Sequence, residues 1–193
     1  QKLNDLDTVS GATYSSNAIK NATMNALGVK IEQEVIPDAP TEKPAPGLYY
    51  IEMKDRTDVV DHGVVGESKK VGAYLRVDND GKMWLTYKMV SGTTGEPLYV
   101  LGYNGYYPNG DTTQPLTKEG VTYSTESTTA PTIGDCTVVT DITVPLDGIS
   151  QTYVNNVYLY VEAMKNLNGE VSGVYFDAGK FNINSTITLY WDT

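Results

Sequence analysis

Apolar and polar side chains alternate along most of the chain after residue 47, with the two-residue period of a β-strand. Residues 73–77 and 83–89 alternate on either side of an Asp-Asn-Asp-Gly run that can reverse the chain. The same alternation recurs in residues 138–144, 157–163 and 187–191. One side of each segment is apolar and the other carries Thr, Tyr or charge, as in an antiparallel sheet covered on one face. The pattern predicts a mainly β fold, an antiparallel immunoglobulin-like β-sandwich.

The N-terminal end follows a helical period instead. Apolar residues recur at helical spacing over residues 15–27, where paired serines precede them and Gly28 follows as a stop. Four prolines then fall within residues 37–47, which predicts a semi-extended spacer. We therefore expect three parts: an N-terminal segment with a short helix (1–30), a Pro-rich linker (31–46) and a β domain (47–193).

Composition excludes several classes of function. The chain has 14 Lys and Arg against 24 Asp and Glu, and its net charge of −10 argues against nucleic acid and anionic membranes as partners. One His and one Cys rule out disulfides and Cys-rich metal sites. No apolar run approaches the roughly 18–20 residues of a membrane-spanning helix. The sequence has no initiator Met and no signal sequence, so we expect a processed product or an excerpt of a longer protein.

The segment Asp7–Ser16 reads D-T-V-S-G-A-T-Y-S-S and carries the most specific chemistry. Thr13 supplies a hydroxyl group, and Gly11 lets the backbone approach a phosphate closely. The predicted helix begins directly afterwards, and free N–H groups at a helix start favour an anion. Taken alone, the segment could also be a polar turn and helix cap.

Residues 5–28 resemble the end of the FMN-binding domain of bacterial surface redox proteins and respiratory subunits. In that family the last Thr of S-G-A-T accepts FMN through a phosphoester bond made by a flavin transferase, and Thr13 is the matching residue. The resemblance implies covalent FMN at Thr13. The surrounding cofactor-binding residues would be Asp7, Ser10, Gly11 and Ala12.

The layout of residues 47–193 resembles a NEAT-type domain, a surface module of Gram-positive bacteria that takes haem or haemoproteins. The resemblance rests on an opening strand at 48–53, the 73–89 hairpin and three later strands. Haem-binding members use Tyr-x-x-x-Tyr on a late hairpin strand, with the first Tyr as the iron ligand. That spacing occurs here only in residues 99–107, which we predict to be a loop, so the sequence favours haem less than other ligands. Met164 could be a soft iron ligand or a buried side chain.

Tyrosine is unusually abundant, with 15 Tyr against two Phe. Its rigid, amphipathic ring suits stacking on sugars and capture of proteins, although half-buried strand positions would also explain many of them. We predict residues 98–111 as the binding loop, and the hairpin around residues 157–175 as a second site. The candidate ligand-binding residues are Tyr99, Tyr103, Tyr106, Tyr107, Tyr158, Tyr160, Tyr175 and Met164.

No catalytic residue and no metal site is predicted. Asp55, Asp58, Asp61 and His62 could gather around a cation, but an acidic, solvated loop explains them better. If the chain is redox-active, we expect an electron carrier rather than a hydrolase or a transferase.

Three functions remain open at this stage. The first is a non-enzymatic binding or adhesion module, capturing haem, a haemoprotein or a glycan. The second is a covalently flavinylated, extracellular electron-transfer protein, and the third is a structural spacer. A lone Cys in a Thr-, Tyr- and Asn-rich β chain favours an extracellular or cell-wall location in a Gram-positive bacterium.

Overall fold

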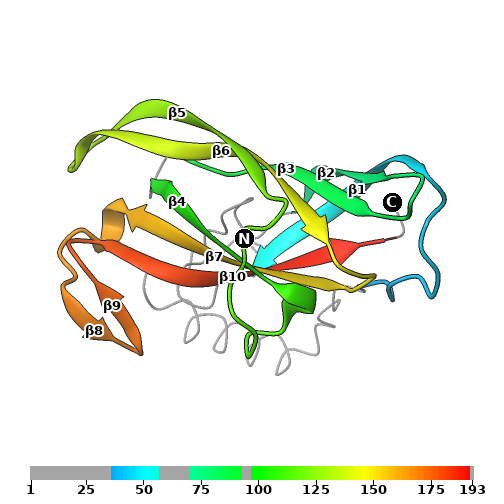
Figure 1. The fold of residues 1–193 in the computed structure, drawn as a ribbon. Coiled ribbons are helices and arrows are strands. Elements are labelled where there is room, and N and C mark those ends of the chain that lie inside the picture. Colours follow the sequence, from blue (N-terminus) through cyan, green and yellow to red (C-terminus); the bar gives the residue numbers. More distant parts are fainter. Residues whose placement is uncertain (1–35, 57–69, 93–96, 192–193) are drawn as a thin grey trace, which may run out of the picture. The chain divides into compact units, whose positions relative to one another are not determined.

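The computed structural model in Figure 1 describes residues 36–56, 70–92 and 97–191. The chain divides into two compact units, residues 1–36 and 37–193, and the described residues belong almost wholly to the second. The helix expected at 15–27 lies outside the described residues. Among those described there is no α-helix, and no helical segment is long and apolar enough to cross a membrane.

The described part of the second unit contains strands and two short 3-10 turns, η2 (Pro108–Gly110) and η3 (Glu162–Met164). The strands are β1 (Gly47–Arg56), β2 (Val71–Val77), β3 (Met83–Lys88), β4 (Leu98–Tyr107), β5 (Thr122–Ala130), β6 (Gly134–Leu146), β7 (Thr152–Val161), β8 (Gly169–Val171), β9 (Val174–Phe176) and β10 (Lys180–Tyr190).

Eight of these strands form one continuous sheet in the order β4-β7-β10-β1-β2-β3-β6-β5, and β8 and β9 form a small separate hairpin. Every pairing is antiparallel, which confirms the mainly β, antiparallel class. The structure differs from the expected sandwich because the ladder is not divided into two sheets. The long strand β6 pairs with β3 over residues 141–146 and with β5 over residues 134–143, so hydrogen bonding continues around the bend.

The sheet curls until it is nearly closed and barrel-like, as Figure 1 shows. Tyr103 of β4 and Tyr123 of β5, the two strands at the ends of the order, have ring centroids 6.2 Å apart. Close by, Thr117 exchanges two backbone hydrogen bonds with Tyr106, at 2.9 and 3.0 Å. The concave side of the curled sheet therefore encloses the core.

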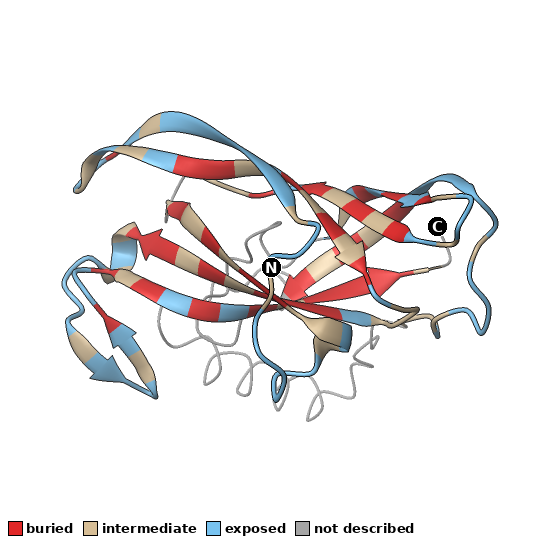
Figure 2. Cartoon of the chain, viewed as in Figure 1, coloured by how far each residue is buried: buried red, intermediate tan, exposed pale blue. Residues whose placement is uncertain are grey.

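The core follows the alternation read from the sequence (Figure 2). The predicted hairpin forms between β2 and β3, and its turn is closed by Gly81 N–H donating to the Asp78 carbonyl at 2.9 Å. The inward side chains of these two strands all join the main cluster. They are Ala73, Leu75, Val77, Met83, Leu85 and Tyr87.

One predicted core position is wrong. Val138 was expected to share a face with Ile142 and Val144, yet it belongs to a second cluster with Tyr99 and Tyr160. The reason is a β-bulge, because one residue between Tyr123 and Thr125 on β5 opposes two residues between Val139 and Ile142 on β6. The extra residue reverses the alternation, so Val139 takes the place in the main core.

Candidate functional sites

The flavin-attachment residues predicted from the sequence lie outside the described residues. They are Asp7, Ser10, Gly11, Ala12 and Thr13. Whether these residues fit FMN is therefore judged from the chemical groups that they supply. The Thr13 hydroxyl can form a phosphate ester, and Gly11 adds no side chain where the phosphate would approach.

The predicted binding loop at 98–111 is mostly a strand, which corrects the expectation. Residues 98–107 form β4, which pairs with β7 along its length, and only the segment from Pro108 onwards leaves the sheet. Two register shifts, between Val100 and Gly102 and between Tyr103 and Gly105, disturb the regular alternation. The two bulges hide the strand from a simple two-residue pattern.

The bulges also decide where the tyrosines of β4 point. Tyr103 and Tyr106 join Leu98 and Val100 in the main core, whereas Tyr99 packs in the second cluster. Two residues four positions apart on a regular strand would share a face, but Tyr99 and Tyr103 lie on opposite faces. They do not form the same-face pair on which the NEAT-type haem motif depends.

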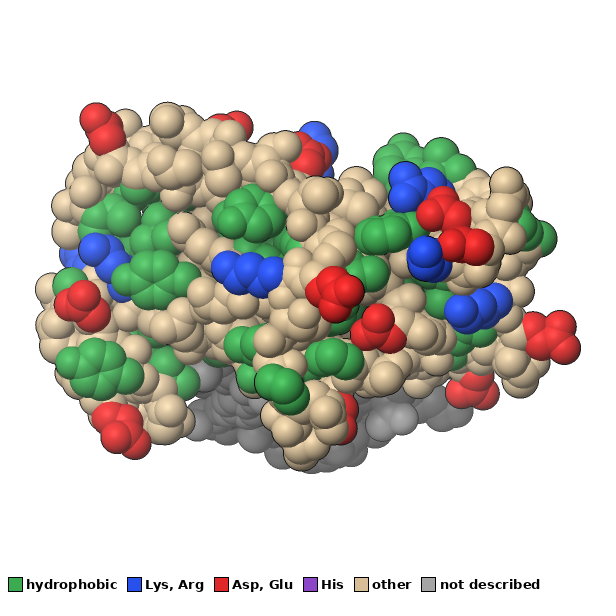
Figure 3. All heavy atoms as spheres, in the orientation of Figure 1, with side chains coloured by type: hydrophobic (Ala, Val, Ile, Leu, Met, Phe, Trp, Pro, Cys, Tyr) green, Lys and Arg blue, Asp and Glu red, His purple; other side chains and the backbone are tan. Residues whose placement is uncertain are grey.

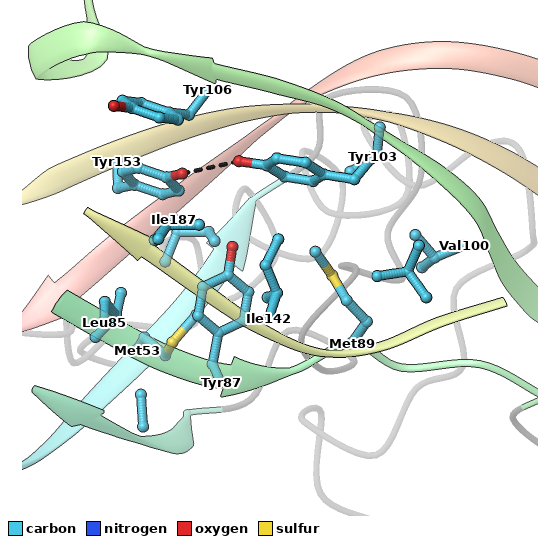
Figure 4. Packing of buried hydrophobic residues seen from close by; sticks show 14 of the residues in the cluster. Met53, Leu85, Tyr87, Met89, Val100, Tyr103, Tyr106, Ile142, Tyr153 and Ile187 are labelled. Atoms are coloured by element: carbon cyan, nitrogen blue, oxygen red, sulfur yellow. Dashed lines mark hydrogen bonds between the residues drawn. The ribbon is translucent and has the colours of Figure 1, made fainter. Parts of the chain in front are cut away.

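A buried hydrogen-bond network holds three of the core tyrosines (Figure 4). The hydroxyl groups of Tyr103 and Tyr153 lie 2.9 Å apart, and Tyr103 also donates to Asn155 Oδ1 at 2.8 Å. Asn155 Nδ2 in turn donates to the Tyr87 hydroxyl at 2.9 Å. Burial raises the pKa of the Tyr87, Tyr103 and Tyr153 phenols, so they stay neutral. These groups satisfy one another inside the core and are not available to a ligand.

The candidates of the 157–175 region do not converge either. Tyr160 is buried and donates to Glu162 Oε2 at 2.7 Å, while Tyr158 is half-buried on the opposite face of β7 from the main core, next to Gly102. Met164 packs against the main core from η3, as expected for a structural methionine. Tyr175 is 71% exposed on the small β8–β9 hairpin. No common ligand site joins them.

A small pocket lies where β4 ends, between η2 and the β6–β7 connection. Its volume is about 300 Å³, part of it open to solvent. Tyr106 and Tyr153 contribute to its wall but are only 4% exposed, and Tyr106 stacks on Tyr153 with ring centroids 5.8 Å apart. The rings are thus already packed against each other, and Asn109, Asp147 and Ser150 leave the rest of the lining polar.

A pair of exposed aromatic side chains lies on the outer face of β1 and β2. Tyr50 and Tyr74 are 54% and 56% exposed and directly oppose each other in the β1–β2 ladder. With Leu48 and Gly72 they form what we call the β1–β2 platform. Sequence reasoning missed it, although a signal was present: Tyr74 stands between Ala73 and Leu75, which face inward, so its ring must face outward.

The acidic candidates are dispersed or outside the described residues. Asp55 is buried and accepts a hydrogen bond from Ser185 Oγ at 2.7 Å, while Asp58, Asp61 and His62 are not described. Within the described ranges, no group of three His, Cys, Asp or Glu side chains could hold a metal ion.

The described strands define an antiparallel β domain with one eight-stranded sheet, a small separate hairpin and a tyrosine-rich core. The family model of the FMN-binding domain matches residues 1–28, which confirms the resemblance of the N-terminal segment to that family. The match does not extend to the β domain, so the NEAT-type resemblance has no such support. Neither the search of curated proteins nor the search of solved structures gave a match.

Proposed function

We propose that this chain is part of a covalently flavinylated electron-transfer protein of the bacterial cell surface, with FMN on Thr13. The observation that carries the proposal is the FMN-binding-domain match over residues 1–28, which contains the S-G-A-T run. The chain acts as an electron carrier in this proposal, and its partners are a flavin transferase and a redox protein that exchanges electrons with the flavin.

The residues of the segment have separate roles in this proposal. Thr13 holds the FMN phosphate through its side-chain oxygen, and Gly11 lets the backbone come close to that phosphate. The helix predicted from residue 15 would place free backbone N–H groups near the same anion. When bound, FMN supplies reversible electron transfer, and the protein residues bind and orient it.

The β domain does not support haem capture through the Tyr99–Tyr103 pair. A haem-ligating tyrosine pair would need an accessible surface. On β4, Tyr99 and Tyr103 are both buried, and they lie on opposite faces of the strand. A ligand captured by the β domain would have to contact exposed side chains on other strands.

The test is co-expression of the full chain with a flavin transferase, beside Thr13→Ala and the matched control Thr8→Ala from the same decapeptide. Visible absorption and intact mass are measured on protein purified under denaturing conditions. We expect a flavin band and a mass gain of one FMN less one water in the wild type and in Thr8→Ala. Flavin retained by Thr13→Ala, or absent from the wild type, would overturn the proposal.

A further inference from the structure

We propose that the β1–β2 platform binds an uncharged polysaccharide through the exposed rings of Tyr50 and Tyr74. This function is separate from flavin attachment, because it uses the outer face of the β domain alone. It would hold the protein on a glycan surface by non-covalent contacts.

The geometry of the platform is set by the sheet. Tyr50 and Tyr74 are cross-strand neighbours whose ring centroids lie 6.3 Å apart, with ring planes at 78°. Gly72 has no side chain beneath the Tyr50 ring, and a Cβ added there would lie 2.5 Å from a ring atom. The missing side chain lets Tyr50 lie against the sheet. Glycine weakens a strand interior, and it often marks a close approach of this kind.

A row of hydroxyl groups continues the platform across the sheet. Tyr74 opposes Thr86 on β3, and Thr86 opposes Thr143 on β6. The two Thr hydroxyl groups lie 2.9 Å apart, and Thr143 opposes the exposed Thr122 on β5. Neighbouring strands are about 4.8 Å apart. The aromatic rings on β1 and β2 are therefore followed, along one line across the sheet, by the hydroxyl groups on β3, β6 and β5. A pyranose has the matching chemistry, since the C–H groups on one face of the ring are apolar and its rim carries hydroxyl groups.

The charges beside the platform select an uncharged ligand. Lys70 pairs with Glu52 at 3.3 Å on one side, and Arg76 pairs with Asp78 at 3.0 Å on the other. On the face shown in Figure 3, acidic and basic side chains lie beside one another at the end where β1, β2 and β3 appear in Figure 1. The local charges cancel, while the net charge of −10 repels acidic polymers.

The size of the apolar surface favours a sugar over a folded protein partner. A stable protein interface buries about 800 Å² on each partner around an apolar centre. The platform offers two phenol rings and Leu48, bordered by charged pairs. A single sugar can stack on the face of one ring and meet the second ring at its side, because the two ring planes are at 78° to each other.

The experiment is native affinity electrophoresis of the full chain in gels that contain one polysaccharide each. The probes are β-1,4-glucan, β-1,3-glucan, α-1,4-glucan, xylan and mannan, with polygalacturonate as the acidic comparison. The variants are Tyr50→Ala, Tyr74→Ala and Gly72→Val, and the matched control is Tyr175→Ala on β9. Gly72→Val keeps both tyrosines but displaces the Tyr50 ring, and circular dichroism verifies that each variant is folded.

We expect at least one uncharged polymer to retard the wild type and Tyr175→Ala, with polygalacturonate having no effect. Each platform variant should lose affinity about tenfold, which corresponds to about 1.4 kcal/mol. The flavin-free Thr13→Ala chain should bind as the wild type does, which separates this proposal from flavin attachment. Absence of retardation by every uncharged polymer, or equal loss in Tyr175→Ala, would overturn it.

Discussion

Tyr103 donates a hydrogen bond to Asn155 Oδ1 at 2.8 Å in the centre of the β domain, where neither residue is more than 2% exposed. Tyr103→Phe keeps the ring but removes this donor and the contact with the Tyr153 hydroxyl. Because the buried Tyr153 hydroxyl and Asn155 Oδ1 then each lose a hydrogen-bond partner, we expect the free energy of unfolding to fall by about 1–3 kcal/mol. Urea denaturation measures the change. Tyr123→Phe is the control, since that ring is 45% exposed, and an equal loss there would contradict the assignment.

The conformation of Gly105 predicts that the stability of the β domain depends strongly on the absence of a side chain at this position. Its φ is +140°, and an added Cβ would lie 2.6 Å from the Thr117 carbonyl oxygen. Gly105→Ala should therefore suffer both backbone strain and a clash, and lose about 3 kcal/mol or more. Gly134 also has a positive φ but open space around it, so Gly134→Ala should lose only about 1–2 kcal/mol. Thermal unfolding compares the two, and equal losses would show that the Thr117 contact is unimportant.

Glu162 ties the turn of the β5–β6 hairpin to the end of β7 and predicts an acid-dependent stability. Partial burial raises the pKa of its carboxyl, but hydrogen bonds from Thr132, Tyr160 and Lys165 outweigh this and lower it to about 2. The folded state therefore gains stability above the ordinary pKa of 4.5 and loses it as pH falls toward 2. In acid titration followed by circular dichroism, the difference between wild type and Glu162→Gln should shrink over this range. The exposed Glu126→Gln should follow the wild type, and a constant difference for Glu162→Gln would contradict the prediction.

The buried phenols predict that the folded state also loses stability at alkaline pH. Burial raises the pKa of Tyr87, Tyr103 and Tyr153 in the folded state, whereas unfolded tyrosines ionise near pH 10. Above about pH 10 the unfolded state thus binds fewer protons, and stability falls as pH rises. Phenolate absorbance and circular dichroism, recorded together, should show part of the phenolate signal appearing in the same step as loss of β-structure. Complete ionisation of the tyrosines before any such loss would contradict the prediction.

Local patterns were sufficient to predict the strand class, the β2–β3 hairpin and most of the core. A two-residue period depends only on neighbouring side chains, and the turn at Asp78–Gly81 specifies itself through its own backbone hydrogen bonds. The position of Tyr99 and Tyr103 on opposite faces could not be read in this way. It depends on bulges whose register is set by β7, far away in the sequence. Gly102 and Gly105 were a usable signal, because glycines inside a strand often mark bulges.

The candidate sites likewise could be predicted where they depend on neighbouring residues, but not where they depend on strand pairing between distant segments. The S-G-A-T segment was recognised because its chemistry lies within one short run, and the family match over residues 1–28 agrees. The loop conformation expected for residues 98–107 was wrong, because the density of tyrosines says nothing about strand pairing or the direction of each ring. Exposure of Tyr50 and Tyr74 instead follows from alternation with buried neighbours, a pattern that the amino-acid sequence itself contains.

The pairing of β1 with its neighbours has a mechanical consequence. Tyr190, at the end of β10, opposes Glu52, while Gly47, at the start of β1, opposes Val77 of β2. Because β1 and β10 are antiparallel, a pull through Gly47 and Tyr190 leaves the sheet from the same end. Tension would then load each ladder at its terminal pair and open the pairs one after another, rather than shearing all of them at once. We therefore expect the domain to unfold at a lower force than a domain whose terminal strands are loaded in shear.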